Sequence, residues 1–195
     1  HVFGGRVYLF GSHDRAGGDS YCLEDYEFYS APVTDLTDWS SRGISYRARQ
    51  DPEYSSARPS MYAPDCVCGN DGRYYIYYVM AGFHGSGGYS GPVHVAVSDR
   101  PDGPFEFYGT VQDEKGNPFL RCVPFDPAVM NDNGVIRLYY GAGYPFENSR
   151  IPGLKELLKR LEAKRYQKSL QEIEQEPLGV NGALTVTLRE DMITA

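Results

Sequence analysis

The chain has 195 residues, which fits a single domain, and 41% of them are hydrophobic, enough to bury a core. The formal net charge of −7, from 19 Lys and Arg against 26 Asp and Glu, makes nucleic acid an improbable partner. The longest apolar stretch, Tyr74 to Phe83, is too short to span a bilayer, so no membrane partner is expected. The chain starts at His1, without methionine or a signal-peptide pattern, and we expect it to be cut from something longer.

Aromatic and turn-forming residues dominate the composition. The chain contains 17 Tyr and 9 Phe, together with 22 Gly and 13 Pro. Tyrosine favours strands, whereas glycine and proline mark turns. Up to about residue 150 the sequence therefore predicts an all-β protein with short strands.

The four cysteines are expected to be free thiols. They are Cys22, Cys66, Cys68 and Cys122, and no two pairs stand at zinc-finger spacing. Cys66 and Cys68 share a strand face and are poorly placed to bridge each other. We therefore expect a reducing, cytoplasmic location, with no disulfide framework, no metal site and no cofactor.

The first of three similar units covers about residues 1–45. Its strands are expected at Val2-Phe3, at Arg6 to Phe10 and at Tyr26 to Ser30, with a fourth starting near Trp39. Gly4 and Gly5 form the turn between the first two strands, because glycine readily adopts the positive φ angles of a tight hairpin.

The second unit, about residues 62–110, is the clearest. Strands are expected at 63–69 and 73–79, joined at Asp71-Gly72 by a two-residue type I′ turn. A third strand follows at 93–97 and a fourth at 105–108.

The third unit, about residues 124–195, has the same order. Strands at 125–130 and 135–140 flank an Asn133-Gly134 turn, and a third strand is expected at 183–188. A helical insertion at about 150–176 interrupts it, with leucines at helical spacing at positions 154, 157, 158 and 161. This helix packs on the sheets or, alternatively, forms a cleft wall or a dimer contact, so a homo-oligomer is possible.

A four-stranded antiparallel unit repeated along a chain is typical of a β-propeller. The alternative is three unrelated hairpins in a β-sandwich, but the recurring order of strand, glycine turn and tyrosine-rich strand favours the propeller. Three blades do not close a ring. The predicted fold class is therefore an all-β partial propeller of about three four-stranded blades, completed by further blades of a parent chain.

Hairpin geometry places the start of each first strand on the same face as the loop that follows the second strand. Asp65 precedes its turn glycine by seven residues and Asp126 precedes its own by eight, so the two carboxylates are expected in equivalent slots. Because the first strands line the axis of a propeller, both are expected to face one central pocket. The alternative is that each aspartate caps a turn.

Other candidate residues are expected on the same face. Paired carboxylates in a pocket with tyrosines such as Tyr62 suggest acid/base chemistry on a sugar. His13 and His84 contact the sugar or, equally, form loop hydrogen bonds. Asp14 binds sugar hydroxyls or caps its own loop. The repeat places the matching carboxylate of the first unit just upstream of His1.

The sequence resembles glycoside hydrolase family 43 at three motifs. These are Gly5 to Asp14, Tyr62-Ala63-Pro64-Asp65, and Phe125-Asp126-Pro127-Ala128-Val129 with its Asn133-Gly134 turn. The resemblance implies a five-bladed propeller that cleaves arabinofuranosyl or xylosyl linkages in plant-type glycans by inverting, two-carboxylate hydrolysis, with a carbohydrate as its partner.

The resemblance also implies a role for each carboxylate. Asp126 matches the aspartate that tunes the pKa of the general acid, whereas the base is expected before His1 and the acid after Ala195. The isolated chain is therefore expected to be inactive. The alternative is a non-catalytic propeller that binds glycans or a protein.

Overall fold

The computed structural model describes residues 1–18, 20–57, 59–81, 92–113, 115–118, 124–142, 179–188 and 193–194, the side chains of 124, 141–142, 179–188 and 193–194 excepted. The predicted helical insertion at 150–176, the predicted site residue His84 and the cysteine Cys122 lie outside these residues.

The first blade is a four-stranded antiparallel sheet in the order β1-β2-β3-β4, as predicted. Its strands are β1 (Val2–Phe3), β2 (Arg6–Leu9), β3 (Tyr29–Pro32) and β4 (Ser40–Ser41). A short 3₁₀ helix, η1 (Ala48–Gln50), lies in the connection to the second blade.

The second blade contains β5 (Met61–Cys68), β6 (Tyr74–Met80), β7 (His94–Ser98) and β8 (Glu106–Val111), paired antiparallel in this order. β12 (Ile193–Thr194) adds a fifth strand at the outer edge, next to β8. The end of the described chain therefore returns to the second blade.

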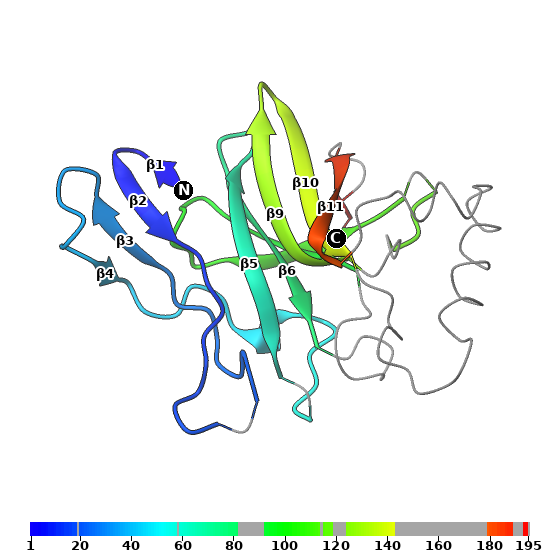
Figure 1. Cartoon of the computed structure of the whole chain (residues 1–195), viewed down its shortest axis with the longest axis horizontal. Coiled ribbons are helices and arrows are strands. Elements are labelled where there is room, and N and C mark those ends of the chain that lie inside the picture. Colours follow the sequence, from blue (N-terminus) through cyan, green and yellow to red (C-terminus); the bar gives the residue numbers. More distant parts are fainter. Residues whose placement is uncertain are drawn as a thin grey trace.

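The third blade contains β9 (Pro124–Asp132), β10 (Val135–Ala142) and β11 (Gly179–Leu188), with β10 in the middle. The three sheets stand side by side along the long axis of the molecule, in the manner of successive propeller blades (Figure 1). The hairpin turns of the first and third blades point to the same side of the molecule in this view. We call this side the turn face and the opposite side the pocket face.

Gly5 and Gly134 stand at hairpin turns, as predicted, and both of these turns have two residues. Gly4 and Gly5 have φ angles of 54° and 77°, and Asn133 and Gly134 have φ angles of 53° and 90°. Two successive positive φ angles define the type I′ geometry, whose twist matches that of the flanking strands.

The predicted two-residue turn at Asp71-Gly72 is wrong. The Gly69 N–H donates to the carbonyl of Arg73 at 2.8 Å, which leaves a three-residue loop in which only Gly72 has a positive φ angle, 80°. The Asp71 carboxylate explains the difference, because it accepts hydrogen bonds from the Arg73 backbone N–H at 3.0 Å and from the Tyr75 hydroxyl at 2.7 Å. These bonds and an ion pair with Arg73 lower the pKa of Asp71 to about 2, against an opposing effect of burial.

The second blade is buried on both sides because its neighbours cover it. Along β6, Ile76, Tyr78 and Met80 belong to a core shared with the first blade, whereas Tyr77 and Val79 belong to a core shared with the third. This alternation follows the two-residue period of a strand. A tyrosine-rich strand therefore forms the centre of the described structure.

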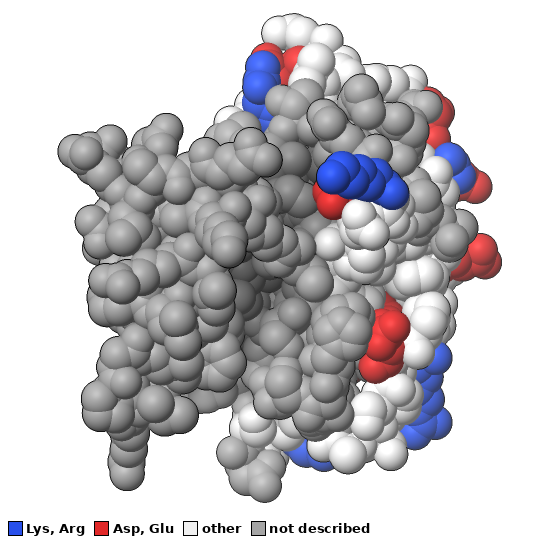
Figure 2. Space-filling model, turned by 90° about the vertical axis from the view of Figure 1, so that its right-hand side faces the viewer, with Lys and Arg blue, Asp and Glu red and all other residues white. Residues whose placement is uncertain are grey.

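The described surface carries mixed charge. Figure 2 shows Lys and Arg side chains scattered among Asp and Glu on the described part of one face. Within the described residues, no helix is long and apolar enough to cross a membrane.

Candidate active site

β5 and β9 both contain a β-bulge near the start of the strand. In β9, Ala128 pairs with Tyr139 and Phe125 pairs with Gly141, so two residues of β9 face one of β10. Asp126 lies in this bulge with a φ of 49°, a left-handed conformation that residues other than glycine seldom adopt. Pro127 follows Asp126, and a proline restricts the backbone conformation of the residue before it.

The β5 bulge has the same form. Asp65 pairs with Tyr77 and Tyr62 pairs with Val79, and Ala63 lies between them with a φ of 45°. Like Asp126, Ala63 precedes a proline.

The register corrects the predicted equivalence of the two carboxylates. The residue of β5 that corresponds to Asp126 is Ala63, and the residue of β9 that corresponds to Asp65 is Ala128. The prediction failed for two reasons that each shift the alignment by one residue. It treated the counts of seven and eight residues before the turn glycines as equal, and it ignored the extra residue in the loop that ends at Gly72. The two aspartates are therefore two positions apart in the aligned strands.

Both carboxylate oxygens of Asp65 make contacts between blades. One carboxylate oxygen, Oδ1, lies 2.6 Å from Nε2 of His1, and the other, Oδ2, accepts a hydrogen bond from the backbone N–H of Val129 at 2.7 Å. The hydrogen bond to Asp65 raises the pKa of His1, although partial burial of the imidazole opposes this. Asp65 thus joins the second blade to residues of the first and third.

Asp126 is solvent-exposed and has no hydrogen-bond partner for its carboxylate among the described residues. Partial desolvation raises its pKa. The pKa of the Cys22 thiol is raised mainly by burial, with further contributions from the negative charges of Asp14 and Asp126. Cys22 belongs to the loop after β2 and lies within electrostatic range of both aspartates.

Hydrogen bonds fasten that loop to the second blade. The Ser12 hydroxyl accepts one from the Ala63 N–H at 2.8 Å, and the Cys22 carbonyl accepts one from the Met61 N–H at 3.2 Å. Asp14 Oδ1 accepts the Cys22 N–H at 2.7 Å and so caps its own loop, one of the two alternatives that the sequence left open.

The predicted residues His13 and Tyr62 lie in the same region. His13 Nδ1 is buried and has no hydrogen-bond partner among the described residues, while the His13 carbonyl accepts the Glu24 N–H at 3.1 Å. The Tyr62 ring meets the Phe125 ring edge-on, with centroids 5.7 Å apart, which brings the starts of β5 and β9 together. The described residues contain no group of three His, Cys, Asp or Glu side chains that could hold a metal ion.

Sequence reasoning missed a buried polar network at the junction of the first two blades. Asp51 is 3% exposed, and its Oδ2 lies 2.7 Å from His94 Nδ1 and accepts a hydrogen bond from the Tyr78 hydroxyl at 2.5 Å. The Tyr78 hydroxyl also lies 2.8 Å from that of Tyr46. The sequence gave no signal for Asp51, which stands in an ordinary connecting segment.

The described sheets form a partial propeller, and the comparison with known families agrees with this fold. The model of Glycosyl hydrolases family 43 matches residues 3–193, and the chain belongs to this family. A xylosidase/arabinosidase of Thermoclostridium stercorarium is 43% identical over 145 residues, which cover 72% of this chain and 29% of that protein. Xylosidase/arabinosidase 43A of Humicola insolens is 33% identical over 153 residues, covering 72% and 41% of the two chains.

Solved structures support the same assignment. A GH43_1 enzyme from Xanthomonas citri, crystallised with xylose, matches with a TM-score of 0.63 and 26% identity, covering 99% of this chain and 50% of that one. The chain therefore spans half or less of the length of these relatives. The predicted all-β partial propeller is confirmed.

Proposed function

We propose that this chain supplies three blades of a glycosidase that removes xylosyl or arabinofuranosyl units from plant-type glycans. The observation that carries the proposal is Asp126, an exposed carboxylate held in a left-handed bulge at the pocket end of β9. The names of the relatives, xylosidase/arabinosidase, support the choice of sugars.

Inverting hydrolysis requires a base that activates water and an acid that protonates the leaving oxygen. We propose that Asp126 stands beside the acid and does not donate the proton itself. A nearby negative charge disfavours ionisation of a carboxyl group, so Asp126 would keep the acid protonated until it reacts. We propose that the base precedes His1 and that the acid follows Ala195.

The remaining residues are assigned to binding and positioning. We propose that the Tyr62 ring, His13 and the second carboxylate oxygen of Asp14 contact the sugar, since Asp14 Oδ1 is already used by the Cys22 N–H. His84 stays a predicted contact. Both oxygens of Asp65 are engaged, so we assign Asp65 to holding the inner strands in register.

The experiment compares two proteins, the 195-residue chain and the chain extended to a complete propeller. Each is incubated with aryl β-xyloside and aryl α-arabinofuranoside, and the anomeric configuration of the released sugar is followed by NMR. We expect inverting hydrolysis by the complete protein and none by the 195-residue chain. Absence of hydrolysis by the folded complete protein would contradict the proposed function, and turnover by the short chain would contradict the assignment of the missing carboxylates.

We also propose that the protein works in a reducing, cytoplasmic compartment. Cys22, Cys66 and Cys68 are free thiols, and burial raises the pKa of each of them, most strongly that of Cys66. Thiols of this kind are typical of proteins in reducing compartments.

A further inference from the structure

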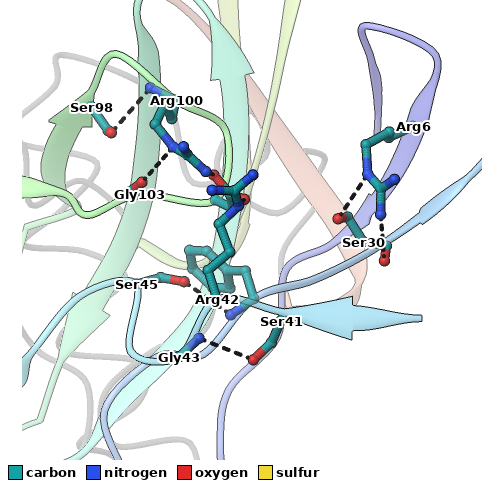
Figure 3. Close-up of polar contacts among 11 residues, drawn as sticks. Arg6, Ser30, Ser41, Arg42, Gly43, Ser45, Ser98, Arg100 and Gly103 are labelled. Carbon is teal, nitrogen blue, oxygen red and sulfur yellow. Dashed lines mark hydrogen bonds and ion pairs between the residues drawn. The ribbon is translucent and has the colours of Figure 1, made fainter. Parts of the chain in front are cut away.

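A cleft of about 370 Å³ lies between the first and second blades. Its lining includes Arg6, Tyr8, Ser30, Arg42, Arg100 and Asp102. Figure 3 shows Arg42 reaching toward Arg100, while Arg6 lies on a separate strand and is turned toward Ser30. We call this the arginine cleft.

The arginine cleft is separated from the candidate active site by the length of the strands. Arg6 begins β2 directly after the Gly4-Gly5 turn, and Arg100 lies in the turn that follows β7. Strand polarity puts both at the turn face, because β7 runs antiparallel to β6 and away from the pocket face. Asp126, at the start of β9, lies at the opposite end of its own blade.

The cleft concentrates positive charge in a chain whose net charge is −7. Its described lining contains three arginines and one carboxylate, that of Asp102, whose side chain is 10% exposed and which pairs with two of the arginines. Arg42 Nε lies 3.0 Å from Asp102 Oδ2, and Arg100 Nη2 lies 2.6 Å from Asp102 Oδ1. One carboxylate cannot balance three guanidinium groups, so the described lining residues carry an excess of two positive charges.

Several guanidinium N–H groups remain available to a ligand. The described contacts of Arg42 use Nε alone, and its side chain is 69% exposed. Arg6 is held by bonds from Nε to the Ser30 hydroxyl at 3.1 Å and from Nη2 to the Ser30 carbonyl at 3.2 Å. A guanidinium has five N–H donors in a planar fork, which matches a carboxylate or a phosphate in bidentate geometry.

An aromatic side chain completes the cleft. Tyr8 is half-buried, and its ring stacks on Phe10 at a centroid distance of 6.3 Å and contacts Phe3 at 5.8 Å. Partial burial raises the pKa of the Tyr8 hydroxyl, and the Asp102 charge adds to this effect. The hydroxyl is therefore a neutral hydrogen-bond donor at physiological pH, beside groups that bind anions.

We infer that the arginine cleft binds the carboxylate of an acidic sugar, a uronate unit carried by the glycan, at the end of the blades opposite to Asp126. Arg42, Arg100 and Arg6 bind the carboxylate, while Tyr8 and Ser40 contact the sugar ring and its hydroxyls. The choice of a sugar over a simple anion rests on the proposed function. Such a site would hold an acidic polysaccharide on the side of the enzyme away from hydrolysis.

The test measures binding by isothermal titration calorimetry to the protein with a complete propeller. The probes are a xylo-oligosaccharide with a glucuronic acid substituent, the same oligosaccharide without it, and inorganic phosphate. We expect the acidic oligosaccharide to bind more tightly than the neutral one, with an affinity that falls as salt is added. Arg42→Ala should weaken this binding about tenfold, since it removes a charge-assisted contact made by a side chain that is 69% exposed.

Arg73→Ala is the matched control, because Arg73 is also an exposed turn-face arginine paired to an aspartate, Asp71, outside the cleft. It should leave binding unchanged. Equal binding of the two oligosaccharides, or equal losses in both variants, would overturn the proposal. Phosphate binding without uronate binding would show a simple anion site and would overturn the assignment to a sugar. Hydrolysis of a neutral aryl xyloside by the same preparation tests the proposed function separately.

Discussion

The inner strands β5 and β9 share the same kind of β-bulge, but each carries its aspartate at a different position. Each strand has a bulge with a left-handed residue before a proline, Ala63 in β5 and Asp126 in β9. Two positions further along, β5 has Asp65 and β9 has Ala128. Both strands repeat the bulge, whereas the position of the aspartate differs between them.

The two aspartates also have different surroundings. The carboxylate of Asp65 meets His1 on one side and the Val129 N–H on the other, so it ties blades together. The carboxylate of Asp126 stands in the bulge, solvent-exposed and without a hydrogen-bond partner among the described residues. A bulge redirects a side chain out of the alternating pattern of a strand, which suits a residue that must reach a substrate or another catalytic group.

The largest expected effect comes from Asp126→Asn in the complete protein. If Asp126 keeps the acid protonated, as proposed, removing its charge should lower kcat by about 10²–10⁴-fold, the usual contribution of acid/base catalysis. The melting temperature should change little, because the side chain is exposed and makes no hydrogen bond among the described residues. Steady-state kinetics on aryl xyloside and thermal unfolding test both statements.

Asp132→Asn is the control for that experiment, since Asp132 lies at the other end of the same strand in an ion pair with Arg137. It should retain the wild-type kcat. If Asp132→Asn and Asp126→Asn lower kcat equally, the loss is structural and the role assigned to Asp126 is wrong.

Asp65→Ala should reduce stability more than activity. The buried Val129 would keep an N–H without an acceptor, which costs about 1–3 kcal/mol of unfolding free energy. Asp65→Asn retains an amide oxygen in place of the carboxylate oxygen and should lose less. Urea denaturation of the three proteins tests this order, and equal losses for the two variants would contradict it.

The His1–Asp65 pair predicts a pH dependence of stability. The pKa of His1 is raised above its ordinary value of 6.5 in the folded chain, so folding favours the protonated imidazole. This contribution is fully present below about pH 6.5 and is lost as the pH rises through the raised pKa. Because the pair is partly exposed, its size should be at most about 1 kcal/mol.

Denaturation measured across pH 5–9 should show this loss in the wild-type chain and a flatter profile in Asp65→Asn. A profile that the substitution leaves unchanged would assign the titration to another group.

The turn glycines and tyrosine-rich strands were enough to predict the blades, because hairpin chemistry and two-residue periodicity are local properties. The predicted equivalence of Asp65 and Asp126 was wrong, because the alignment of the two strands depends on the number of residues in each turn. The prolines at 64 and 127 were the better guide, as they mark the same bulge in both strands. Nothing in the sequence indicated Asp51, because its partners His94 and Tyr78 come from distant strands.

The smallest expected effect tests the shared bulge itself. Ala63 has a φ of 45°, and the left-handed conformation costs an alanine about 1–2 kcal/mol. Glycine avoids this cost and loses roughly 0.5–1 kcal/mol through the greater freedom of the unfolded chain, so Ala63→Gly should stabilise the protein by about 0.5 kcal/mol. Ala128 has no positive φ angle, so Ala128→Gly should destabilise the protein by about 0.5–1 kcal/mol. Opposite signs in urea denaturation would confirm that the bulge residue is Ala63, whereas a loss in both variants would show that the β5 bulge does not strain this residue.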